Sequence, residues 1–287
     1  MLGQLNIYGM DKVELATERL KAYEPDEGYF LAFSGGKDSV VVKALCDMAG
    51  VKYDAHYSIT TVDPPELVRF VKTFNDVQMD ASKDKNGNRI TMWNLIPRKK
   101  MPPTRIARYC CQYLKETNGK GRVTVTGVRW AESANRRRNQ GGMTIYSKGA
   151  KKELDEAGLE YVGTERGGVI LNLDNADTRN AMELCYRTRK TLINPIIEWE
   201  DDDVWEFIHK YNVPYCELYD QGYKRIGCIG CPMNTAAAAE LERYPKYKHL
   251  YMKAFERMLE EIRASGDDDK TSWKTAQDVM DWWLMQR

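Results

Sequence analysis

The hydrophobic residues of this chain follow two patterns, one typical of strands and one typical of helices, and these patterns alternate along the sequence. Short apolar runs predict strands, and segments with apolar residues three or four apart predict helices. The predicted strands cover residues 29–33, 51–59, 122–128 and 192–197, and the predicted helices cover residues 9–22, 40–48, 64–77, 104–116, about 201–211 and 272–286. Because strands and helices alternate, the pattern predicts an α/β fold whose doubly wound, mostly parallel sheet is covered by helices on both faces.

Two regions depart from this alternation. Residues 135–180 are rich in Gly, Asn and charge and have no clear periodicity, so we expect an irregular insertion with a hairpin at residues 168–173. From residue 235 the pattern is largely helical, with a break near Pro245, and Trp282 and Trp283 are expected to pack inward from the final helix. We therefore predict a domain of residues 1–234 and a helical C-terminal extension of residues 235–287.

Composition narrows the class of protein. The 287 residues include 43 Lys and Arg against 42 Asp and Glu, with a mean hydropathy of −0.61. No apolar run approaches the roughly 18 residues of a membrane-spanning helix, and the N-terminus lacks the basic start and apolar block of a signal peptide. We expect a cytoplasmic protein without a membrane partner. Seven cysteines without a secretory signal favour metal or redox chemistry over disulfides.

The near-neutral balance conceals a segregation of charge. Residues 98–138 contain 12 basic residues and two acidic ones, so these 41 residues carry +10 and the remainder −9. A local excess of this size attracts phosphates, and binding to a nucleic-acid backbone would weaken with salt. A solvated, Lys/Arg-rich face is the alternative.

A glycine-containing loop is the first candidate binding site. Residues 34–39 read Ser-Gly-Gly-Lys-Asp-Ser and stand between a predicted strand and a predicted helix, where backbone N–H groups and the helix N-terminus form an anion site. Gly35 and Gly36 permit a tight turn and a close approach to phosphate, Lys37 adds a positive charge, and the two serines add hydroxyl donors. The G-x-x-x-x-G-K-[ST] pattern of a Walker A loop is absent.

This loop resembles the PP-loop of the ATP pyrophosphatase (adenine nucleotide α-hydrolase-like) superfamily. Three further segments resemble its phosphoadenosine phosphosulfate (PAPS) reductase branch: TGVRWAES at 126–133 followed by Arg136–Arg138, NPII at 194–197 with DVW at 203–205, and LYDQGY at 218–223 leading to GCIGCP at 227–232. Together these segments span residues 28–235. The resemblance implies a Rossmann-like PP-loop fold in which the loop holds the β- and γ-phosphates of ATP.

The resemblance also implies roles for individual residues. Lys37, Asp38 and Arg129 are the expected catalytic residues, with Asp38 helping to organise Mg²⁺. The expected nucleotide-binding residues are Ser34, Gly35, Gly36, Lys37, Asp38, Ser39, Asp63, Gly127 and Arg129. For Asp63 a helix cap before Pro64 is an equal alternative. Arg136, Arg137 and Arg138 are candidates for bidentate phosphate contacts.

Four cysteines form two close pairs, Cys110–Cys111 and the C-x-x-C of Cys228 and Cys231. Four thiolates suit tetrahedral zinc or a [4Fe–4S] cluster. Adjacent cysteines are awkward for a zinc knuckle, and the set resembles the cluster ligands of assimilatory sulfonucleotide reductases, so a [4Fe–4S] cluster is favoured over zinc and over free thiols. The remaining cysteines are expected to be small buried hydrophobes, with Cys185 as an alternative sulfur carrier: Cys46, Cys185 and Cys216.

One departure from the family bears on the reaction. Sulfonucleotide reductases carry a nucleophilic cysteine in a C-terminal E-C-G-L-H segment, whereas no cysteine follows Cys231 in this sequence. Thiol attack on sulfur needs a positioned thiolate, which argues against reduction of PAPS by the family's usual route. The resemblance to the PP-loop instead implies an enzyme that cleaves ATP to AMP and pyrophosphate and thereby activates an acceptor for sulfur transfer. The basic stretch, together with the family's DNA-phosphorothioation and tRNA-thiolation relatives, implies that this acceptor is DNA or tRNA.

The expected partners are this acceptor, a sulfur-donor protein such as a cysteine desulfurase, and a second copy of the chain in a homo-oligomer. The alternatives are a PAPS or adenylyl-sulfate (APS) reductase that uses another thiol, and a regulator that senses the nucleotide or the cluster without turnover.

Overall fold

A computed structural model of the chain describes residues 2–5, 9–116, 118–146, 150–156, 158, 160–165, 167–171, 190–267 and 271–285. The chain forms two compact units. Unit 1 takes residues 1–57, 70–78 and 119–222, and unit 2 takes residues 58–69, 79–118 and 223–287. The units are therefore interleaved along the sequence, while the linear division after residue 234 stays a prediction.

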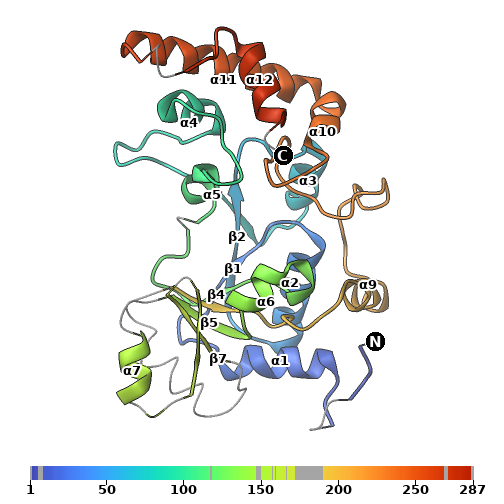
Figure 1. The fold of residues 1–287 in the computed structure, drawn as a ribbon. Helices are drawn as coiled ribbons and strands as arrows, with labels where there is room; N and C mark the ends of the chain where they lie inside the picture. The colour runs from blue at the N-terminus through green and yellow to red at the C-terminus, as the bar shows by residue number, and fades with distance from the viewer. Residues whose placement is uncertain are drawn as a thin grey trace. The chain divides into compact units, whose positions relative to one another are not determined.

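Unit 1 carries the glycine loop and most of the sheet (Figure 1). Its helices are α1 (Lys12–Ala22), α2 (Lys37–Ala49), the 3₁₀ turn η1 (Trp130–Glu132), α6 (Ala134–Asn139), α7 (Ala150–Glu156) and α9 (Asp201–Lys210). Its strands are β1 (Tyr29–Ala32), β4 (Thr124–Val125), β5 (Met143–Tyr146), β6 (Val162–Gly163), β7 (Val169–Leu171) and β8 (Lys190–Ile193). Three elements have residues in both units: β2 (Tyr53–Ile59), α3 (Pro65–Val71) and β3 (Val77–Ala81).

In the described residues eight strands form one sheet in the order β3-β2-β1-β4-β8-β5-β7-β6. The pairs β1–β2, β1–β4 and β4–β8 are parallel, which confirms the predicted α/β fold. Beyond β8 the sheet continues antiparallel through β5, β7 and β6. Helices α1, α2 and α9 pack together in this unit.

The expectation of an irregular insertion was wrong for the described part of residues 135–180. That part contributes strands β5, β6 and β7 and helices α6 and α7. The hairpin pairs Val162 with Ile170 and Gly163 with Val169, so it begins earlier than residue 168. The strands are two to four residues long, which is too short to produce a visible alternation in the sequence, and their pairing to β8 is decided by the sheet. Cys185 lies outside the described residues.

Local sequence explains where the helices of unit 1 begin and end. Asp11 accepts hydrogen bonds from the N–H groups of Val13 and Glu14, and Glu14 accepts one from Asp11 N, so a capping box starts α1. In the first turn of α9 the buried Asp203 pairs with Lys12 and accepts a hydrogen bond from Glu200 N at 2.8 Å. Burial opposes ionisation, but these two donors outweigh it and lower the pKa of Asp203.

Unit 2 is built around helices (Figure 1). They are α4 (Met92–Lys99), α5 (Tyr109–Leu114), α10 (Ala237–Arg243), α11 (Pro245–Ala264) and α12 (Ala276–Met285). Helix α11 packs against α4, α10 and α12. Pro245 occupies the first turn of α11, which confirms the predicted break.

Trp283 closes the core of unit 2. Its side chain is fully buried, its ring packs against Tyr251 and Phe255, and its indole Nε1 donates to Pro103 O at 2.7 Å. Trp282 is only partly buried, so the expected inward packing holds in full for one tryptophan of the pair. None of the described helices is both long and apolar enough to span a bilayer, and the cytoplasmic location stays a prediction.

Candidate functional site

The glycine loop joins β1 to α2, as predicted. Gly35 has a φ of +72°, in the left-handed region that a side chain disfavours, and Gly36 precedes the first residue of α2 without a side-chain cap. Ser39 Oγ donates to Gly36 O at 2.9 Å, and Ser34 Oγ donates to Ser39 Oγ at 3.2 Å. The two serines therefore stabilise the loop from inside, and Ser39 N and Val40 N donate to Gly36 O at 3.0 and 3.1 Å. Lys37 is the first residue of α2, so its amide has no acceptor within the helix.

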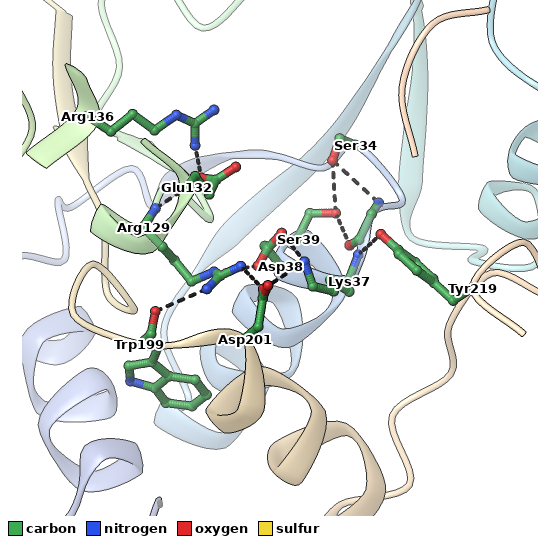
Figure 2. Close-up of polar contacts among 11 residues, drawn as sticks. Ser34, Lys37, Asp38, Ser39, Arg129, Glu132, Arg136, Trp199, Asp201 and Tyr219 are labelled. Atoms are coloured by element: carbon green, nitrogen blue, oxygen red, sulfur yellow. Dashed lines mark hydrogen bonds and ion pairs between the residues drawn. The ribbon is translucent and has the colours of Figure 1, made fainter. Parts of the chain in front are cut away.

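Lys37 is the first residue of α2 and is nearly fully buried. Its backbone N–H donates to the phenol oxygen of Tyr219 at 2.9 Å. Its ammonium lies 3.2 Å from Asp201 Oδ1 and 3.6 Å from Asp38 Oδ2. Figure 2 shows these contacts converging on the loop from α2, from α9 and from the segment after α9. The backbone nitrogen and the side-chain nitrogen of Lys37 therefore both contact protein oxygens.

Arg129 lies beside the loop and is 1% exposed. Its Nε donates to Asp38 Oδ1 at 2.6 Å, and the other two nitrogen atoms donate to Asp201 Oδ1 at 2.6 Å and to the carbonyl oxygen of Trp199 at 3.1 Å. Burial opposes the charge, but the two carboxylates outweigh it and raise the pKa of Arg129. All three nitrogen atoms thus donate within the protein, and the phosphate contact and catalytic role expected of Arg129 stay predictions.

Gly127 is placed against the start of α2. A Cβ at this position would lie 2.9 Å from the backbone carbon and from the Cβ of Asp38. The segment after β4 can therefore approach the loop only with glycine here. This explains one of the predicted site residues by packing rather than by a contact with nucleotide.

Two residues at the loop were missed as site residues. Asp201 belongs to the acidic run of residues 200–203 at the start of α9, where carboxylates favour the helix dipole, and the sequence carries no signal that it reaches Lys37. Tyr219 stands in the LYDQGY segment that supported the resemblance, so its position in a matched motif was the available signal.

The basic stretch is divided between the two units. Residues 98–115 of the stretch belong to unit 2 and residues 120–138 belong to unit 1. Five of its 12 basic residues, all of them described, pair with acidic side chains: Lys100 with Asp267, Arg122 with Asp54, Arg129 with Asp38 and Asp201, Arg136 with Glu132, and Arg138 with Glu165. A charge count along the sequence overstates the positive field because several of these partners lie outside the stretch.

The four paired cysteines all belong to unit 2 and are half-buried. The neighbouring thiols of Cys110 and Cys111 interact, which raises the pKa of Cys110 and lowers the pKa of Cys111. The Cys228 and Cys231 thiols lie near enough to raise the pKa of Cys110 further. Burial raises the pKa of Cys228 to about 11, against the opposing effect of the Lys115 ammonium.

The loop that carries Cys228 and Cys231 is held from several sides. Ile229 N donates to Val62 O at 2.7 Å, and the Tyr251 hydroxyl donates to Ile229 O at 3.0 Å. The buried Glu240 accepts from Gly230 N at 3.3 Å and from Asn234 Nδ2 at 2.8 Å. These contacts preset the turn between the two cysteines.

Asp63 faces this cysteine loop. Its carboxylate accepts a hydrogen bond from Thr60 N at 3.0 Å, and the Cys228 thiol lies 3.6 Å from Thr60 Oγ1 and 4.0 Å from Asp63 Oδ1. The nucleotide contact expected of Asp63 stays a prediction. The contacts that the structure describes show Asp63 stabilising the turn after β2.

A thiolate-bound metal suits this donor set in chemistry, since four soft sulfur ligands gather in one unit. Within the described residues, however, no three Cys, His, Asp or Glu side chains already stand in a metal-binding arrangement. The metal ligands thus stay predictions. Cys46 and Cys216 are fully buried, as expected.

The loop and the sheet define the class of protein: an α/β protein whose phosphate-binding type of loop links the first strand to the following helix. A family model described as "Phosphoadenosine phosphosulfate reductase domain" matches residues 28–234, and the chain belongs to that family.

Individual relatives add detail. The chain is 28% identical over 250 residues to an uncharacterized protein of Methanocaldococcus jannaschii, which covers 83% of this chain and 48% of the relative. It is 43% identical over 54 residues to an adenosine 5'-phosphosulfate reductase of Oceanobacillus iheyensis, covering 19% of this chain and 22% of that protein. The chain thus spans about half or less of the length of these relatives.

Two solved structures are similar. A phosphoadenylyl-sulfate reductase from Candida auris in a phosphate complex matches with a TM-score of 0.41 at 16% identity, covering 78% of this chain and 96% of that one. An NMN synthetase from Francisella tularensis matches with a TM-score of 0.35 at 13% identity, covering 92% of this chain and 98% of that one.

Proposed function

We propose that this protein is an ATP-dependent enzyme that activates an acceptor for sulfur transfer. The acceptor oxygen attacks the α-phosphorus of ATP, the bond from this phosphorus to the bridging oxygen breaks, and pyrophosphate leaves with the electron pair. A hydrosulfide then attacks the carbon that bears the adenylated oxygen, and AMP leaves. The observation that carries the proposal is the loop itself: a glycine turn after β1 places the backbone amide and the ammonium of Lys37 at the N-terminus of α2, a position that suits phosphate groups.

The chain's own residues act through position and charge. The loop amides and Lys37 stabilise the charge that grows on the leaving diphosphate. Arg129 keeps Asp38 in place and so fixes the first turn of α2. Both carboxylates near the loop, Asp38 and Asp201, already pair with cations, so they do not fit a protein-held Mg²⁺, and no step is assigned to that ion.

Four exposed cations of unit 2 support a nucleic acid as the acceptor. Residues 85–115 contain no acidic residue, and Arg98, Lys99, Arg105 and Arg108 are exposed. Ile106, between the last two, is 98% exposed. Cations of this kind contact phosphates, and an apolar tip beside them suits stacked bases.

The thiol cluster completes the proposal. A [4Fe–4S] cluster on Cys110, Cys111, Cys228 and Cys231 would tie these segments together. Iron measured after anaerobic purification tests this: Cys228→Ser is expected to lose the iron, and Cys216→Ala to keep it. Zinc bound in its place would contradict the cluster.

The central experiment measures pyrophosphate release from ATP with DNA, with tRNA and without either, in the presence of hydrosulfide. We expect release only with the acceptor, and a loss of about a hundredfold or more in Lys37→Ala, as when one transition-state donor is removed. Lys72→Ala, at an exposed lysine of unit 1, is the matched control. Release that is independent of Lys37, or absent with every acceptor, would refute the proposal.

A sulfonucleotide reductase is the second candidate, favoured by the local identity to adenosine 5'-phosphosulfate reductases. Incubation with labelled APS or PAPS and thioredoxin separates the two, because the reductase releases sulfite and the ATP-dependent enzyme releases pyrophosphate from ATP. Binding of ATP without either product would indicate a regulator.

A further inference from the structure

Two cations and two carboxylates alternate at the loop (Figure 2). Lys37 contacts Asp201 at 3.2 Å and Asp38 at 3.6 Å, and Arg129 contacts each of the same carboxylates at 2.6 Å. The quartet is electrically neutral as a whole. A phosphate that approaches it therefore meets no net positive charge unless one carboxylate moves away.

The four members differ in how easily they can move. The side chains of Lys37 and Arg129 are 7% and 2% exposed, and that of Asp38 is 23% exposed, whereas that of Asp201 is 70% exposed. Asp201 can turn into water at little desolvation cost, while Arg129 keeps Asp38 and the Trp199 carbonyl as partners. Asp201 is thus the exchangeable member of the quartet.

A second protein oxygen, the Tyr219 hydroxyl, contacts Lys37. The Tyr219 hydroxyl oxygen accepts the hydrogen bond of Lys37 N at 2.9 Å, and the Tyr219 ring packs edge-on against Trp205 with 5.3 Å between centroids. The amide and the ammonium of Lys37 are the two groups that would meet a phosphate, and each one already holds a protein oxygen.

We propose that Asp201 and Tyr219 are internal stand-ins for the two phosphoryl groups of a diphosphate, and that a diphosphate ligand binds by displacing both. The inference rests on the proposed function in taking the loop as the phosphate site, and it assigns to that site a diphosphate-bearing substrate class. A single phosphate replaces one of the two oxygens, whereas a diphosphate replaces both. The stand-ins lower the affinity of the loop for anions and keep the loop ordered until the substrate arrives.

Calorimetric titration of the full chain with inorganic pyrophosphate and with inorganic phosphate tests this. Removing a stand-in removes the cost of displacing it, so Asp201→Asn is expected to tighten pyrophosphate binding about fivefold and Tyr219→Phe about threefold, as befits one partly exposed contact each. The double variant is expected to combine the gains for pyrophosphate to about fifteenfold. For phosphate it should gain no more than the better single variant.

Asp202→Asn is the matched control, because Asp202 is exposed in the same turn of α9 and the substitution removes the same charge. It is expected to change pyrophosphate binding less than about twofold. A purely structural role for Asp201 predicts weaker binding in Asp201→Asn, and a general charge effect predicts equal gains in the two asparagine variants. Either result overturns the inference.

Two further readouts separate this inference from the proposed function. Circular dichroism reports whether Asp201→Asn folds; if it does not, Tyr219→Phe, which keeps the ring, carries the test alone, and binding no tighter than wild type refutes the inference. Pyrophosphate binding that follows the expected order without ATP cleavage refutes the proposed reaction and leaves the inference standing. Absence of pyrophosphate binding in wild type and variants refutes the inference.

Discussion

Replacement of Arg129 by leucine is the sharpest test of how the loop is held. The substitution keeps a similar volume and removes a charge with three acceptors: Asp38, Asp201 and the Trp199 carbonyl. Breaking a buried charged network by removing one partner costs about 3–5 kcal/mol. Because the Asp38 and Asp201 side chains are 23% and 70% exposed, water compensates part of the loss, and we expect the lower end, about 3 kcal/mol.

This cost corresponds to a fall in Tm of about 6–12 °C for a chain of this size. The measurement is thermal unfolding followed by circular dichroism, with urea unfolding at 25 °C as a second determination. Arg136→Leu is the matched control, since Arg136 pairs with Glu132 one helical turn away near the surface, and it is expected to cost about 0.5 kcal/mol or less. Arg129→Lys retains the charge but not the geometry of three separate donors, and should fall between the two.

The reasoning is refuted if Arg129→Leu melts within about 2 °C of Arg136→Leu, a difference below one kcal/mol. That result would mean that Asp38 and Asp201 are stabilised by water and by Lys37 alone. Arg129 would then be available to a ligand, and its expected phosphate contact would gain support.

Three other substitutions have defined outcomes. Asp203→Asn removes a carboxylate whose pKa is lowered in the folded state. Such a carboxylate stabilises the folded protein at pH values above its ordinary pKa of about 3.9, and this stabilisation is lost as the pH falls through the folded-state pKa. Urea unfolding should therefore show wild type losing more stability than Asp203→Asn between about pH 5 and pH 2.5, and parallel losses would contradict the assignment. Trp283→Ala removes a fully buried ring and an indole donor. It is expected to cost about 3–5 kcal/mol, against under about 2 for the partly buried Trp282→Ala; a cost for Trp283→Ala no larger than that for Trp282→Ala would contradict this expectation. Gly127→Ala forces a Cβ to 2.9 Å from the backbone of α2 and should cost about 1–3 kcal/mol and weaken pyrophosphate binding, whereas Gly3→Ala, with open space around it, should leave both unchanged.

Much of the fold follows from local sequence. The capping box at Asp11, the left-handed glycine of the loop at Gly35 and the proline that opens α11 at Pro245 each act within a few residues. Hydrophobic spacing over one or two turns is equally local, and for that reason the strand, loop and helix around residues 29–49 were predicted correctly. The short strands β5 and β6 were not, because the sheet rather than their own pattern decides their pairing, whereas β7 lies within the hairpin predicted at residues 168–173.

The sequence by itself determined the α/β class, the position of the phosphate-type loop and the family to which the chain belongs. Only the tertiary structure decided which side chains meet at that loop. Arg129 reaches Asp38 across 91 residues of sequence, Asp201 across 72, and Tyr219 reaches the amide of Lys37 across 182. No periodicity or spacing connects positions so far apart, because the order of strands in the sheet brings them together and burial then selects their partners. In the same way the basic stretch, continuous in sequence, is divided between two units by the course of the chain.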